Sequence, residues 1–392
     1  MAVGRWVALA AWGFGVPSAG AAEVTDMPAE LGVLGSATYR GSRLDGGLEE
    51  DGIRVGDRRF LRHDALVHLE FAPLEGLALT VEADATPAMQ WEYPGGRTML
   101  LDPLTGTGTY LTESDRAATE DTGPSSPETG TTATTGTTTT APAKRGAPGF
   151  EAGGLNGIWF GVAAAPFSQL YKRHQAANWR LDLAFRTGSA KHSLWTYNGD
   201  RRGSSPGGTA LRVAGAFSSD YGVGEPYLTA EWLKENKVKV DVLDANGAAV
   251  AKGLEVRPGS TLSSTGGVEI VAWEALEKGH RVAFDLSGTF GYKSWADVAT
   301  GVYLPDTLPI GERLPVTTSE HVFARFGLGF DVHAARHFRA KFGTNATFRT
   351  PYRLEHLYSV YTTPDSWELG WFFTLGGTGA VAGNSADPPR TE

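Results

Sequence analysis

The segment Ser366-Trp-Glu-Leu-Gly-Trp-Phe-Phe-Thr-Leu375 alternates strictly between two kinds of position. One face of the extended chain carries only large apolar side chains: Trp367, Leu369, Trp371, Phe373 and Leu375. Successive residues of a β-strand point to opposite faces, so the segment is predicted to be a strand with one unbroken apolar face. On an open sheet edge in water such a face invites aggregation. In a barrel that closes within a membrane, the same face meets lipid and the closure removes the edge.

Composition agrees with a large β protein. Glycine accounts for 51 of the 392 residues, against an average of about 7%, and there are 18 Phe, 11 Trp and 12 Tyr. The net charge of −9 argues against nucleic acid as a partner. A mean hydropathy of −0.21 argues against a helical polytopic membrane protein, but it suits a barrel with a polar lumen and polar loops. The absence of cysteine excludes disulfides, thiolate metal sites and cysteine nucleophiles.

Both ends of the chain and one internal stretch lack the strand pattern. Residues 1–21 are predicted to be a secretory signal, with Arg5, an apolar run and an Ala19-Gly20-Ala21 cleavage site, or alternatively a buried N-terminal element. A periplasmic N-terminal segment (22–32) would follow, and a polar periplasmic tail (378–392) would end the chain. The Thr-rich stretch 113–148 is predicted to be a disordered insertion in an extracellular loop, the alternative being a linker between two domains.

Alternating segments fill residues 33–377, and the connections between them are alternately short and long. The first long connection is predicted to be a polar loop over residues 44–57. The clearest hairpin pairs Val322–Val332 with Phe338–Phe348 around a tight turn. Short periplasmic turns and long extracellular loops are typical of transmembrane barrels. We therefore predict a single all-β, antiparallel up-and-down barrel of about 12 strands, or about 14 if residues 88–112 supply a hairpin. A soluble β-sandwich is the alternative. Aromatic girdles are expected at two levels: Trp179 and Tyr227 at one end, Trp232, Trp295 and Trp367 at the other.

The spacing within the terminal strand also resembles a known targeting motif. Glu368, Gly370, Phe373 and Leu375 follow the order of the β-signal found in bacterial outer-membrane β-barrel proteins of the porin-like kind. That resemblance implies delivery by the secretory pathway and insertion by the barrel-assembly machinery. It also implies an integral location among outer-membrane lipid and lipopolysaccharide of a Gram-negative bacterium. The tail beyond Leu375 departs from the pattern, because many such proteins end at this strand.

The face opposite the apolar one is rich in charge of both signs. Its charged positions are Glu70, Glu82, Asp84, Arg180, Asp182, Arg186, Arg212, Glu231, Glu269, Arg281, Asp285, Arg325, Asp331, Arg339, Lys341 and Arg349. Two arrangements are possible. The charges either form an ion-paired interior, or a basic stripe faces an acidic one and creates a transverse electric field that selects polar solutes. The basic stripe would comprise Arg325, Arg339, Lys341 and Arg349, and the acidic stripe Glu70, Glu82 and Asp84. We expect a narrow passive channel or export conduit for small polar or saccharide solutes. The alternative is a non-conducting structural or surface-display barrel.

The sequence offers weak support for enzymatic chemistry. H-E-x-x-H is absent, and Gly203-Ser-Ser-Pro-Gly207 matches G-x-S-x-G only by letter, because no helical pattern follows it. His333 and His337 flank a turn and are expected to be solvated. We therefore expect no catalytic residues, no metal and no cofactor.

Overall fold

The computed structural model describes residues 25–50, 53–92, 98–101, 108–111, 150–166, 177–188, 193–195, 208–243, 249–275, 280–298, 315–335, 338–356, 360–364 and 366–380. The predicted secretory signal, the Thr-rich insertion and residues 381–392 lie outside the described residues. Within the described ranges, no helix is both long enough and apolar enough to cross a membrane.

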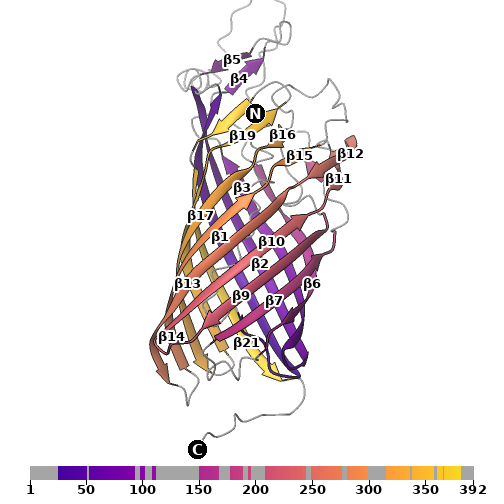
Figure 1. Cartoon of the computed structure of the whole chain (residues 1–392). Helices are drawn as coiled ribbons and strands as arrows, with labels where there is room; N and C mark the ends of the chain where they lie inside the picture. The colour runs from indigo at the N-terminus through magenta and orange to yellow at the C-terminus, as the bar shows by residue number, and fades with distance from the viewer. Residues whose placement is uncertain are drawn as a thin grey trace, which may run out of the picture.

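Twelve long strands form a closed antiparallel barrel, which confirms the predicted fold class and strand count (Figure 1). Each barrel strand pairs with the next barrel strand along the chain, and the last pairs with the first, with Ala37 opposite Leu375. The barrel strands are β1 (Gly32–Glu50), β2 (Ile53–Leu74), β3 (Leu77–Glu92), β6 (Phe150–Ala164), β7 (Ala177–Arg186), β9 (Ala210–Ser219), β10 (Gly224–Glu235), β13 (Ser260–Ala275), β14 (His280–Lys293), β17 (His321–Ala335), β18 (Phe338–Arg349) and β21 (Ser366–Ala380). Closure leaves no edge strand in the barrel.

The two ends of the barrel differ. At the short-turn end, β2 joins β3 through residues 75–76 and β9 joins β10 through residues 220–223. At the long-loop end the connections carry further strands (Figure 1). Among these, β4 (Thr98–Leu101) and β5 (Gly108–Leu111) pair only with each other among the described strands. Residues 88–112 thus contain a hairpin, but it adds no strand to the barrel.

A ladder of short strands continues the wall beyond the long-loop end. These strands pair in the order β8 (Ser193–Trp195), β11 (Val238–Leu243), β12 (Ala249–Arg257), β15 (Ala296–Val298), β16 (Pro315–Thr318), β19 (Tyr352–His356) and β20 (Val360–Thr363), and β20 reaches Glu49 and Glu50 of β1. The prediction of a polar loop over residues 44–57 is therefore wrong. Strands β1 and β2 remain paired there, with Asp45 opposite Arg59, although the sequence has lost its apolar alternation.

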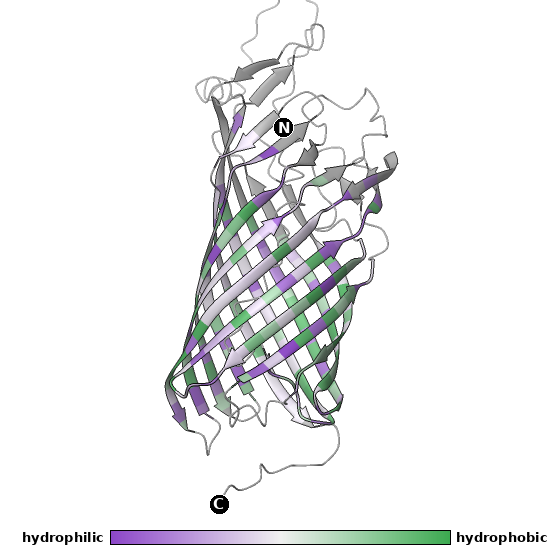
Figure 2. Ribbon diagram, viewed as in Figure 1, coloured by the Kyte–Doolittle hydropathy of each residue, from purple (hydrophilic) through white to green (hydrophobic). Residues whose placement is uncertain are grey.

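Large apolar side chains surround the barrel on its outside. All twelve barrel strands contribute exposed ones, and on β21 the exposed fractions are 42% for Trp367, 48% for Leu369 and 44% for Phe373. Along the strands in Figure 2, hydrophobic residues recur between more polar ones, as expected for a two-faced wall. A continuous apolar surface around the whole molecule would not be stable in water, but it matches the hydrocarbon layer of a membrane.

The predicted girdle residues are placed correctly with one exception. Trp179, Trp232, Trp295 and Trp367 are all exposed on the outside. Tyr227, in contrast, is 5% exposed and donates its hydroxyl to Asp285, 2.9 Å away, in the lumen. Its side chain is in phase with the inward-facing Glu231 of the same strand and out of phase with Trp232. The period of the strand, rather than residue type, sets its direction.

Candidate functional site in the lumen

The acidic residues predicted on β2 and β3 are bound by arginines of strands further along the same side of the wall. Glu70 accepts a hydrogen bond of 2.5 Å from Arg180 Nη2, and Arg180 also donates to Asp182 at 2.7 Å. Glu82 accepts from Arg212 Nη1 at 3.2 Å. These contacts join β2 to β7 and β3 to β9, so the side chains reach over the strands that lie between them.

Two further groups complete this side of the lumen. His68 lies between the two ion pairs, with Nε2 2.8 Å from Glu70 Oε1 and Nδ1 3.5 Å from Glu82 Oε2. Asp84 accepts a hydrogen bond of 3.0 Å from the amide of Asn156. The predicted acidic stripe is therefore bound to neighbouring donors along its length.

The predicted basic stripe is bound in the same way. On β18, Lys341 donates to Asp285 at 3.0 Å, Arg339 pairs with Asp331, and Arg349 pairs with Glu368. On β17, Arg325 donates to Thr347 Oγ1 at 2.9 Å. Opposite charges meet locally, so the two stripes are largely neutralised where they stand. This arrangement corresponds to an ion-paired interior rather than to a field across the lumen.

Arg186 lies apart from both stripes. It is fully buried at the long-loop end and donates from Nη2 to Glu235 Oε1 at 2.8 Å. Its guanidinium also lies 5.4 Å from the ring centre of Trp159, within the range of a cation–π contact.

Aromatic rings lie flat on the inside of the wall where glycine makes room. Phe372 covers Gly343, where a Cβ would come within 2.7 Å of the ring. Phe323 covers Gly291 in the same way, at 2.2 Å. A residue larger than glycine at either position would push the ring into the lumen, so these glycines keep the interior open enough for the charged side chains.

The segment before β1 lies inside the barrel at the short-turn end. The Asp26 carbonyl accepts a hydrogen bond of 2.5 Å from Arg180 Nη1 of β7, and Asp26 Oδ2 lies 3.7 Å from Arg339 Nη1 of β18. These two strands are fifth and eleventh in the closed order of twelve, and therefore belong to opposite walls. A backbone that was expected to extend into the periplasm thus crosses the lumen instead.

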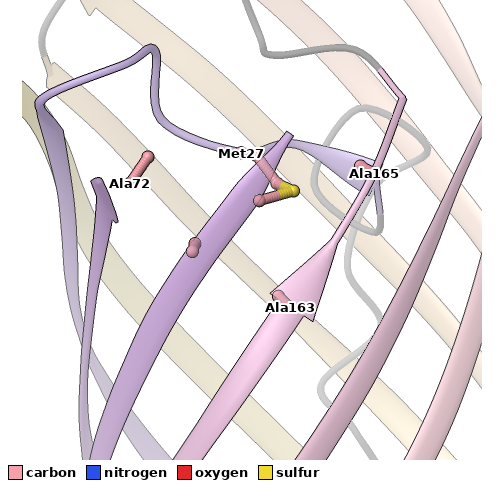
Figure 3. Close-up of a cluster of buried hydrophobic side chains, with 5 residues drawn as sticks. Met27, Ala72, Ala163 and Ala165 are labelled. Atoms are coloured by element: carbon pink, nitrogen blue, oxygen red, sulfur yellow. The ribbon is translucent and has the colours of Figure 1, made fainter. Parts of the chain in front are cut away.

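Apolar contacts fix the same segment. Met27 is fully buried among four alanines of β2, β3 and the end of β6: Ala72, Ala78, Ala163 and Ala165 (Figure 3). Thr25 Oγ1 lies 2.8 Å from Ser218 Oγ, and Leu31 donates its backbone N–H to the Ala72 carbonyl at 2.7 Å. We call residues 25–31 the N-terminal plug segment.

Several lumen residues were missed in the sequence, for two reasons. Glu225 and Glu235 are in phase with Glu231 on β10, and Lys293 extends the inward series of β14, so a longer strand assignment would have found them. Asp26 and Met27 carry no such signal, because their positions depend on where the chain enters the barrel.

The closed sheet, the apolar exterior and the polar interior together define the class. The chain has the fold of an integral membrane β-barrel of the outer-membrane type.

No family model and no curated protein matches the sequence. Solved structures with a similar chain path are distant. The COG4313 outer membrane channel from Pseudomonas putida F1 is 8% identical, with 90% of this chain and 98% of that chain covered and a TM-score of 0.43. For the β domain of the Bordetella autotransporter BrkA the identity is 11%, the coverage 87% and 98%, and the TM-score 0.35. For the P. putida toluene transporter TodX the corresponding values are 8%, 93%, 94% and 0.36.

Proposed function

We propose that the barrel is a narrow conduit for small polar solutes and that the N-terminal plug segment closes its periplasmic mouth in the present conformation. The observation that carries the proposal is the path of this segment between Arg180 and Arg339 on opposite walls. Short turns face the periplasm in bacterial barrels, which assigns the plug to that side.

The composition of the wall supports a polar solute. Inward positions on β13 and β14 carry hydroxyl groups, and these side chains are half-buried rather than fully buried: Ser263, Thr265, Ser287 and Thr289. Strands β13 and β14 are six places from β2 and β3 in the closed order, so this hydroxyl-lined wall faces Glu70 and Glu82. Hydroxyl and carboxylate groups can exchange hydrogen bonds with a hydroxyl-rich solute, including a saccharide.

The size of the barrel fits the same proposal. Barrels of about 8 strands are filled by their own side chains, whereas those of 16 leave an aqueous channel. With 12 strands, the contents of the lumen decide whether it conducts. Removing one segment of the chain from the lumen would then change the cross-section substantially.

One observation favours a second candidate, a non-conducting barrel that acts through its extracellular strands. The Lys341 and Asp285 side chains are only 2% and 1% exposed, so the lumen is densely packed at that level. The ladder from β8 to β20 would then be the functional surface.

Planar-bilayer conductance separates the two candidates. We expect the intact protein to be mostly closed and a variant lacking residues 25–31 to give steady conductance steps. Met27→Asp should open the lumen as well, because a carboxylate cannot be buried among four alanines without a partner. The control is Val223→Asp, which places the same charge in an exposed turn at the same end.

Each remaining outcome has a definite meaning. Silence of all folded variants would refute the conduit and leave the non-conducting barrel. Steady conductance of the intact protein, unchanged by the deletion, would retain the conduit and refute closure by the plug segment.

A further inference from the structure

A separate polar cluster lies in the lumen at the long-loop end. It comprises Arg186 at the end of β7, Glu235 at the end of β10, Thr261 of β13 and Lys293 at the end of β14. The side chains of Arg186, Glu235 and Lys293 are 0%, 2% and 3% exposed, and Thr261 is 3% exposed. These four residues come from four different strands, so the barrel wall fixes their positions relative to one another.

Hydrogen bonding within the cluster is incomplete. Arg186 donates from Nη2 to Glu235 Oε1 at 2.8 Å and from Nε to the Gly208 carbonyl at 3.1 Å. Lys293 Nζ is 3.7 Å from Glu235 Oε2, beyond hydrogen-bond distance. Four buried atoms make no hydrogen bond within the part of the chain that the structure describes: Arg186 Nη1, Glu235 Oε2, Thr261 Oγ1 and Lys293 Nζ.

The charges of the cluster do not balance. Two cations share one carboxylate, which leaves one net positive charge in the cluster. Within the described ranges, the charged groups that act on Lys293 are Glu235 and Arg186. An uncompensated charge is strongly unfavourable in such a buried place. A water molecule would supply hydrogen bonds but no charge.

The cluster is also enclosed. Trp159 and Leu233, which are 3% and 2% exposed, pack with Ala184 and Ala210 on β6, β7, β9 and β10, beside the Arg186 and Glu235 end of the cluster. The Trp159 ring contacts the Arg186 guanidinium. Apolar packing on one side weakens competition from water for the unpaired donors.

We propose that Arg186, Lys293 and Thr261 form a binding site for one small monovalent anion, either a halide or a carboxylate of similar size. The guanidinium, the ammonium and the hydroxyl donate hydrogen bonds to it, and one negative charge neutralises the cluster. A divalent anion would overcompensate beside Glu235. The site does not depend on whether the barrel conducts.

Refolding in different salts tests the site, because the site is enclosed during folding. The protein is refolded in detergent with sodium bromide, sodium formate or sodium gluconate at equal ionic strength, and thermal unfolding is followed. We expect bromide or formate to raise the unfolding midpoint by about 2–4 °C over the bulky gluconate. Lys293→Met should abolish this difference, whereas Lys237→Met, at a lysine that is 67% exposed, should retain it.

Bromide provides a direct readout. Crystals of protein refolded in bromide should give an anomalous peak between Arg186 Nη1 and Lys293 Nζ. Equal midpoints in all three salts, or a peak at that position that persists in Lys293→Met, would overturn the proposal. If Lys293→Met does not fold, the comparison of salts and the anomalous map of the native protein still decide the question.

Discussion

The outer face and the lumen face of this barrel are built from the same strands, yet they are specified differently. On β21, Leu369 and Phe373 face outward and are about half exposed, while Glu368 and Phe372, the residues immediately before them, face inward. An outward residue meets lipid and needs only to be apolar. An inward residue needs a particular partner, as Glu368 has in Arg349. Each residue of the outer face is therefore constrained on its own, whereas residues of the lumen are constrained in pairs.

This difference predicts how the two faces respond to substitution. Exchanging one apolar residue for another on the outside should cost little, because lipid accommodates different shapes. Removing one partner of a lumen ion pair leaves a buried charge without compensation. The resulting loss of stability is typically larger than the net stability that the intact pair contributes.

The largest effect is expected for Asp285→Asn. Asp285 is fully buried and accepts hydrogen bonds from Lys341 and Tyr227, so its neutralisation leaves the Lys341 ammonium without its carboxylate. We expect a loss of about 3–5 kcal/mol in the free energy of unfolding, measured by denaturant titration in lipid vesicles.

The double variant Asp285→Asn with Lys341→Met is the control for this prediction. It removes both charges, and we expect it to recover most of the lost stability. If the double variant is less stable than Asp285→Asn alone, the lumen is not organised by charge pairs.

A charge on the outer face should have the next largest effect. Leu369 is 48% exposed in the apolar band, and arginine at such a position should cost about 2–4 kcal/mol because it is placed in hydrocarbon. The same denaturant titration applies. Val223→Arg is the matched control, since Val223 is 78% exposed but lies in the turn between β9 and β10, where water is available. Equal costs at the two positions would mean that lipid does not surround Leu369.

The same contrast explains what the sequence could and could not predict. The barrel and its strand count follow from period-2 alternation, because each apolar position carries its own signal. The prediction of a loop over residues 44–57 was wrong because apolar alternation is required only where a strand contacts lipid. The β1–β2 hairpin projects beyond the lipid, where it keeps its hydrogen-bonded pairing without alternating apolar residues.

The contents of the lumen were only partly predictable. Alternation predicts Glu70, Arg180 and Lys341 on the polar face, but it could not show which residues pair with one another inside the barrel. The bond between Glu70 and Arg180 depends on the curvature of the closed sheet rather than on either strand alone. The position of Asp26 is even less predictable from the local sequence, because it depends on a short segment before β1 entering the lumen.

The smallest effect is expected outside the barrel, at an ion pair that has access to water on strand β12. Hydrogen bonds from Arg257 and Lys237 lower the pKa of Glu255, and the two charges contribute further. Because the pKa of Glu255 is lower in the folded protein, its carboxylate contributes stability at pH values above about 4.3, the pKa of a glutamate in the unfolded chain. This contribution is lost as the pH falls through the pKa of Glu255 in the folded protein. Because water screens an exposed pair, Glu255→Gln should leave the unfolding midpoint at neutral pH unchanged within error.

The measurable consequence is local: NMR titration of the Glu255 carboxyl should give a midpoint below that of the Arg257→Gln variant. An identical titration midpoint in the two proteins would show that the Glu255–Arg257 pair does not form in solution. A large loss of stability in Glu255→Gln would mean that an ion pair outside the barrel wall stabilises the protein as much as the pairs inside it.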